Sequence, residues 1–171
     1  RGDQTWAAVG AAGTKTLARF TAFDNHPPAS GFATIDTRNS LMVLLFADAV
    51  VSSAVFHSSI PQGADTSSGI DVIVSGMAAS STSGVMRLRV EFERGTTDID
   101  SDSFDTATEA NLTVSGTSGI ATTVTVTCTA IDSLVAGDPF RLRLSRVGND
   151  GTNDTLSDTW QFRHVELRQV A

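Results

Sequence analysis

The chain has 171 residues, a formal net charge of −7 at pH 7 and one cysteine, Cys128. This length fits a single domain whose core needs no disulfide bonds for support. The negative charge argues against nucleic acid and against an anionic membrane surface as partners, and no stretch approaches the ~20 consecutive apolar residues of a membrane-spanning helix.

The first 16 residues are small and rich in glycine and alanine, and Trp6 is their only aromatic residue. No strand or helix period runs through them, so we expect residues 1–30 to form an N-terminal arm followed by one lead-in strand. A lone tryptophan in such an arm suits a pocket on a neighbouring subunit. The alternative is an ordinary chain end without a fixed position.

Residues 31–171 consist of short segments in which apolar and polar residues alternate, separated by turn residues. Alternation with period two is the pattern of half-buried strands, and no helical period occurs. The residues expected to face the core are Met86, Leu88, Val90, Phe92, Val124, Val126, Cys128, Phe140, Leu142 and Leu144. Roughly eight or nine such strands predict an all-β, two-sheet antiparallel sandwich, with a jelly roll preferred because eight strands in two sheets is its count.

Two segments depart from simple alternation. Residues 41–46 are continuously apolar, which indicates that both faces of this strand are covered by the arm, by a loop or by another subunit. The apolar phase of residues 160–167 slips at Arg163 and His164. This slip predicts a β-bulge there, or an outward-facing pair of aromatic side chains. The residues expected to contact a second subunit are therefore Trp6, Leu41, Val43, Leu45, Trp160 and Phe162.

Residues 32–170 resemble a family of small structural or uncharacterised virion proteins of tailed bacteriophages. The segments that carry the resemblance are FATIDTRNS, SSAVFHSSIP, SGVMRLRVEFER, TDIDSDSF, GDPFRLRLSRVGNDGTNDT and FRHVELR. The resemblance implies a β-rich virion component, decorating the capsid or attached to head or tail as a fibre module. It also implies a homotrimer that contacts other virion proteins, and it brings no catalytic residues. The chain departs from the family pattern at residues 41–46 and 62–68, which leaves the oligomeric state open.

The alternative function is a carbohydrate-binding β-sandwich module used for adhesion to a cell surface. Such a module needs clustered exposed aromatic residues, and Trp160 and Phe162 are the only pair that the sequence offers. No serine lies in a Gly-x-Ser-x-Gly motif, and the three histidines lack the spacing of a zinc site. We therefore do not expect an enzyme.

Asp98, Asp100 and Asp102 are spaced two residues apart, and Glu109 is twelfth from Asp98. This is the carboxylate spacing of an EF-hand, but Ser103 stands where that loop requires glycine. The three aspartates are candidate ligands of calcium in some other geometry, and the alternative is a solvated acidic loop. No other cofactor is expected. A second acidic loop, residues 150–158, has the same two interpretations.

Overall fold

The computed structural model describes residues 15–95 and 101–171, so Trp6, Asp98 and Asp100 lie outside the described residues. The elements are β1 (Thr16–Thr21), the 3-10 turn η1 (Ala22–Asp24), β2 (Thr34–Arg38), β3 (Leu41–Phe46), β4 (Val51–Ser59), β5 (Ile70–Ala78), β6 (Gly84–Arg94), β7 (Thr108–Val114), β8 (Thr122–Cys128), β9 (Pro139–Val147) and β10 (Trp160–Gln169). Within this described part of the chain, no helix is long and apolar enough to cross a membrane.

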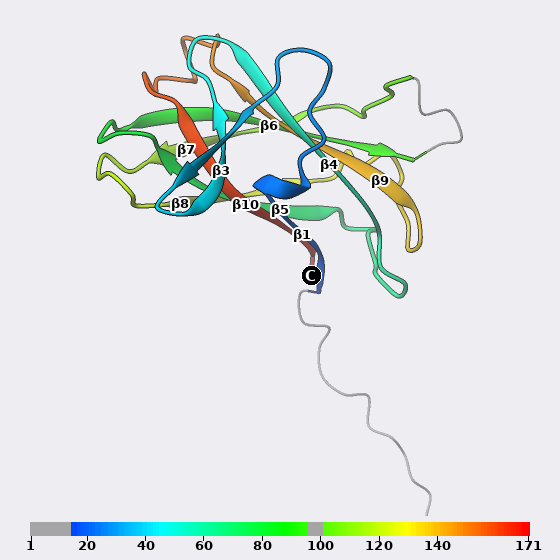
Figure 1. The fold of residues 1–171 in the computed structure, drawn as a ribbon. Helices are drawn as coiled ribbons and strands as arrows, with labels where there is room; N and C mark the ends of the chain where they lie inside the picture. Colours follow the sequence, from blue (N-terminus) through cyan, green and yellow to red (C-terminus); the bar gives the residue numbers. More distant parts are fainter. Residues whose placement is uncertain (1–14, 96–100) are drawn as a thin grey trace, which may run out of the picture.

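The strands form two antiparallel sheets packed face to face (Figure 1). The larger sheet has the order β2-β3-β10-β5-β8, and β1 also pairs with β10. The smaller sheet has the order β4-β9-β6-β7. From β3 to β10 nearly every connection crosses between the sheets, which is the arrangement of a jelly roll. The predicted two-sheet antiparallel sandwich is confirmed, and because β1 is part of it, the sandwich starts ahead of residue 31.

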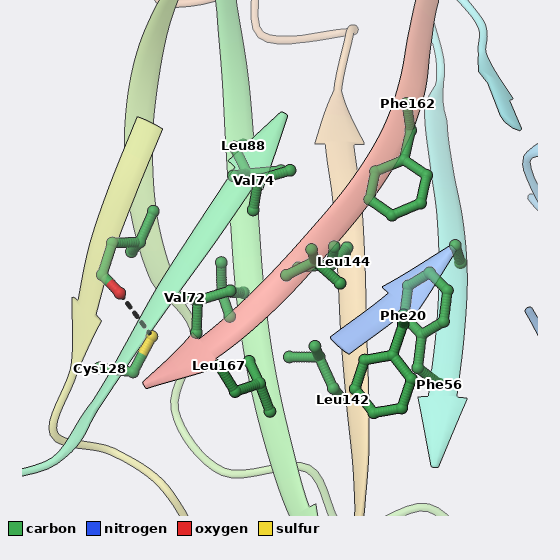
Figure 2. Packing of buried hydrophobic residues seen from close by; sticks show 14 of the residues in the cluster. Phe20, Phe56, Val72, Val74, Leu88, Cys128, Leu142, Leu144, Phe162 and Leu167 are labelled. Carbon is green, nitrogen blue, oxygen red and sulfur yellow. Dashed lines mark hydrogen bonds between the residues drawn. The ribbon is translucent and has the colours of Figure 1, made fainter. Parts of the chain in front are cut away.

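The core lies between the two sheets, where side chains of alternate positions meet (Figure 2). Nine of the ten residues expected to face it are buried, and the tenth, Val124, is partly buried and packs against it. Cys128 is among the buried residues, and its burial raises the pKa of the thiol to about 11. This cysteine is therefore protonated and unreactive at neutral pH.

A β-bulge in β10 resolves the phase slip in the sequence. The pairing of β10 with β5 shifts register between Phe162 and His164, as predicted. Trp160 and Phe162 before the bulge, and Val165 and Leu167 after it, consequently all face the core and are buried. The expectation that Trp160 and Phe162 contact a second subunit is therefore wrong, because the extra residue of the bulge returns both segments to the same face.

The middle of the apolar strand β3 is covered on both faces, and the cover comes from the chain itself. Leu44 and Phe46 face the core, whereas Val43 faces outward and is still buried within a single chain. The β2–β3 hairpin is anchored there by Arg38, whose guanidinium donates to the Ala78 carbonyl at 3.0 Å and to Gln161 at 2.6 Å. The expectation that Val43 contacts a second subunit is thus wrong.

The two remaining β3 residues expected at a subunit contact differ from Val43. Leu45 is partly buried, and Leu41, beside the hairpin turn, is 57% exposed. Asn39 and Ser40 form this turn with positive φ angles of 47° and 65°, which suits a tight two-residue hairpin connection. The turn therefore presents Leu41 on the outer face of the larger sheet, at the edge of the hollow described next.

Candidate functional site

The described part of the first acidic loop is clamped to the outer face of the smaller sheet. Asp102, with a side chain 63% exposed, accepts a hydrogen bond from Arg141 at 2.9 Å. The ring of Phe104 lies 3.9 Å from the Arg143 guanidinium, and Ser103 donates its backbone N–H to Glu93 at 2.9 Å. The structure thus places Asp102 in an ion pair with an arginine.

Carboxylates of the second acidic loop are also occupied within the fold. Asp150 accepts from Asn153 at 2.8 Å, Asp158 accepts from the backbone N–H of Ser80 at 2.8 Å, and Asp154 pairs with Arg146 at 2.8 Å. Across residues 15–95 and 101–171, no three or more His, Cys, Asp or Glu side chains are grouped so that they could hold a metal ion. In the described chain these loops therefore use their carboxylates as structural acceptors.

A hollow of about 510 Å³ opens on the outer face of the larger sheet, where β1, β3 and β10 meet the 3-10 turn η1. Strand register brings its polar residues together, because Arg19 lies opposite Glu166 and Thr21 lies opposite His164 across the β1–β10 pair. Arg163, Leu41 and Phe23 also line the hollow. Among the sequence candidates within the described residues, Leu41 alone lines this hollow.

An exposed aromatic ring forms one wall of the hollow. Phe23 is 73% exposed and sits in η1, which is held by Asp24. The Asp24 carboxylate accepts hydrogen bonds from the Thr21 backbone N–H at 2.7 Å and from the Thr21 hydroxyl at 2.8 Å. Phe23 also borders a second hollow of about 270 Å³, whose far side includes Phe32 and Ile35. The turn therefore holds the backbone at Phe23 in a conformation that leaves its large apolar ring exposed.

The single carboxylate of the hollow is already neutralised. Glu166 accepts hydrogen bonds from Arg168 and from the Thr16 hydroxyl, each at 2.7 Å, and forms an ion pair with Arg19 at 3.0 Å. The hydrogen bond from Arg168, followed by that from Thr16, lowers the pKa of Glu166 to about 2. Glu166 is therefore ionised at neutral pH.

His164 supplies both a donor and an acceptor to the hollow. Its partial burial, and then the charges of Arg163 and Arg19, lower the pKa of the imidazole below its ordinary value. A neutral imidazole has one N–H donor and one nitrogen acceptor. Together with the Thr21 hydroxyl, the site thus combines an apolar ring with neutral hydrogen-bonding groups and arginines.

We expect Glu166→Gln to lower the free energy of unfolding at pH 7. The destabilisation should disappear as the pH falls toward 2. A carboxylate whose pKa falls from 4.5 to about 2 on folding contributes stability above the unfolded pKa, and this contribution is lost as the pH falls toward 2. Urea unfolding of both proteins at pH 7, 4 and 2.5 checks the result. If the difference in free energy of unfolding between the two proteins stays constant over this pH range, the ion-pair explanation is wrong.

Comparison with known proteins adds information about the fold. No protein-family model and no curated protein matches the chain. A variant of the exo-β-1,3-galactanase from Phanerochaete chrysosporium, solved with β-1,3-galactotriose, matches with a TM-score of 0.53 and 9% identity, over 90% of this chain and 29% of the galactanase. The galactanase with galactose matches with a TM-score of 0.50 and 10% identity, over 92% and 30%. The family 11 carbohydrate-binding module from Clostridium thermocellum matches with a TM-score of 0.46 and 10% identity, over 92% of this chain and 96% of the module.

These identities are low, so the galactanase matches show a shared β-sandwich fold and nothing about shared residues. The chain spans less than a third of the length of the galactanase. Phe23 was missed in the sequence because it follows a short strand and precedes a proline-containing loop, where no periodicity marks it as exposed. The one available signal was its position next to Asp24 and Asn25, residues that favour turns.

Proposed function

We propose that the protein is a carbohydrate-binding β-sandwich module that holds a glycan in the hollow beside Phe23. The observation that carries this proposal is an exposed aromatic ring fixed at the wall of a hollow lined by polar side chains. The hollow's volume of about 510 Å³ lies within the range of small-molecule sites.

The chemistry of the lining suits a sugar. The apolar C–H face of a sugar ring packs on the face of an aromatic side chain, which is the role of Phe23. Sugar hydroxyls both donate and accept hydrogen bonds. Neutral His164 can do the same, and the Thr21 hydroxyl, which donates its proton to Asp24, can accept. Arg19 and Arg163 add further N–H donors, each from a planar guanidinium group.

The fold is consistent with this role. The galactanase structures with a similar β-sandwich were solved with β-1,3-galactotriose and with galactose. We propose binding without catalysis. Most glycoside hydrolases act through two carboxyl groups, whereas Glu166 is the single carboxylate that lines this hollow and is held by two arginines.

Phe23→Ala is expected to weaken glycan binding about tenfold or more, because it removes the apolar surface on which the sugar ring packs. Isothermal titration calorimetry against oligosaccharides of galactose, glucose and mannose, and of their uronic acids, measures the effect. Phe32→Ala is the matched control, since Phe32 is also exposed but lines the second hollow and not the first. The glycan affinity of this variant should stay within about twofold of that of the unmodified protein. Equal affinity of the Phe23→Ala variant and the unmodified protein would contradict the proposed site.

A second candidate function is self-assembly, as the resemblance to phage virion proteins implies. The observation that favours it is the gathering of exposed apolar side chains around η1 and β2, namely Phe23, Phe32, Ile35 and Leu41. Contiguous exposed apolar surface is typical of protein contact sites. Sedimentation at micromolar concentration distinguishes the two functions: a homotrimer gives three times 17.9 kDa, and a species of 17.9 kDa removes this candidate.

A further inference from the structure

We infer that the glycan bound beside Phe23 is acidic, and that Arg163 binds its carboxylate. The ligand class is thus an oligosaccharide that contains a uronic acid. This inference rests on the proposed function and adds the chemical class of the ligand.

The first supporting observation is the charge of the hollow. The whole chain carries a net charge of −7, yet the lining of this hollow contains two arginines and one carboxylate. That carboxylate, Glu166, is already bound by Arg19 at 3.0 Å and by Arg168 at 2.7 Å. The positive charge of Arg163 is consequently left without a counter-ion inside the hollow.

The second observation distinguishes Arg163 from the other arginines. In the part of the chain that the structure describes, Arg163 is the single arginine whose side chain forms neither an ion pair nor a hydrogen bond. The other nine each have at least one such partner: Arg19, Arg38, Arg87, Arg89, Arg94, Arg141, Arg143, Arg146 and Arg168. In a protein with an excess of acidic residues, an exposed arginine without a partner is the exception.

The third observation is how the fold directs this side chain. The bulge between Phe162 and His164 inserts Arg163 as an extra residue of β10. Bulges re-aim side chains, and here Arg163 is exposed and lines the hollow next to His164. It also lines an adjoining hollow of about 370 Å³ with Leu41 and Met77. Arg163 therefore lines two open spaces, and Glu166 is the single acidic residue in their combined lining.

A guanidinium without a partner is suited to a planar anion. Arginine binds a carboxylate through two parallel N–H···O bonds, which gives both affinity and orientation. A uronic acid presents a carboxylate at the edge of a sugar ring whose faces remain apolar. Such a ring can pack on Phe23 while its carboxylate reaches Arg163, so one sugar residue satisfies both features.

The test compares uronic acid oligosaccharides with their carboxyl-reduced counterparts, which keep the ring stereochemistry. The probes are trimers of galacturonic, glucuronic and mannuronic acid, and the matching trimers of galactose, glucose and mannose, titrated calorimetrically at 50 and 500 mM NaCl. At least one acidic trimer is expected to bind about tenfold more tightly than its reduced form at 50 mM NaCl. The preference should shrink at 500 mM NaCl because salt screens exposed charges.

Arg163→Gln should abolish this preference, so that the acidic trimer binds no more tightly than its neutral counterpart. Arg94→Gln, which changes an exposed arginine on the other sheet, should retain the preference. If a neutral trimer binds as tightly as its acid and this binding needs Phe23, the acidic specificity is wrong and the proposed function stands. If no trimer binds, both are wrong.

Discussion

Replacing Asp154 by alanine is expected to lower the free energy of unfolding by about 3–5 kcal/mol. Its partner Arg146 is completely buried and has the inward parity of Leu142 and Leu144 in β9. The guanidinium donates to both carboxylate oxygens of Asp154, at 3.0 and 2.8 Å, and to the carbonyls of Phe46, Leu156 and Asp158. Removal of Asp154 leaves the buried guanidinium with only the partly exposed Asp48, 3.2 Å away, as a counter-ion.

Urea unfolding followed by tryptophan fluorescence measures this loss. Asp150→Ala is the matched control in the same loop, because Asp150 is bonded only within the loop and a loss of about 1 kcal/mol or less is expected. The double variant Arg146→Met with Asp154→Leu should recover only part of the stability, since it removes the buried charge but leaves the carbonyls of Phe46, Leu156 and Asp158 without their donor. A loss below about 1 kcal/mol for Asp154→Ala would show that the ion pair does not hold the β9–β10 loop.

Trp160→Ala is expected to cost about 3–5 kcal/mol of stability and to leave the molecular mass in solution unchanged. The indole is 1% exposed and its ring centroid lies 5.5 Å from that of Phe46 and 6.2 Å from that of Phe162. It also lies against Gly76, where any Cβ atom would overlap the indole ring, so the cavity left by alanine cannot be filled from that side without a second change.

Thermal and urea unfolding, with sedimentation at the same concentration, check both parts of this expectation. Phe32→Ala serves as the control for loss of an exposed aromatic side chain, with an expected cost below about 0.5 kcal/mol. A small stability loss for Trp160→Ala together with a fall in mass would restore the original expectation that Trp160 lies at a subunit contact.

The strands that alternate strictly were predictable because burial imposes period two on them. In β6, Met86, Leu88, Val90 and Phe92 face the core as expected, with charged residues on the other face. The bulge of β10 was also visible, since a phase slip in an otherwise apolar strand has few solutions. The sequence did not decide between a bulge and an outward-facing aromatic pair. That choice depends on whether Gly76 leaves room for Trp160 inside the sandwich.

The hollow beside Phe23 could not be predicted, because it is assembled from segments far apart in the sequence. Thr21 and His164 are opposite each other only through the pairing of the first strand with the last. Leu41 reaches the same place because the β2–β3 hairpin is anchored on β5 and β10 by Arg38. Exposed positions follow no period, so no periodicity in the sequence places Phe23 and Arg163 in one site.

The most direct test of the glycan site is a two-dimensional amide NMR titration with the six acidic and neutral trimers. The largest shift changes are expected at Thr21, Phe23, Arg163 and His164, which line the hollow, and Phe23→Ala should remove them. Changes confined to the outer face of the smaller sheet, around Glu91 and Arg143, or no change with any trimer, would contradict the account.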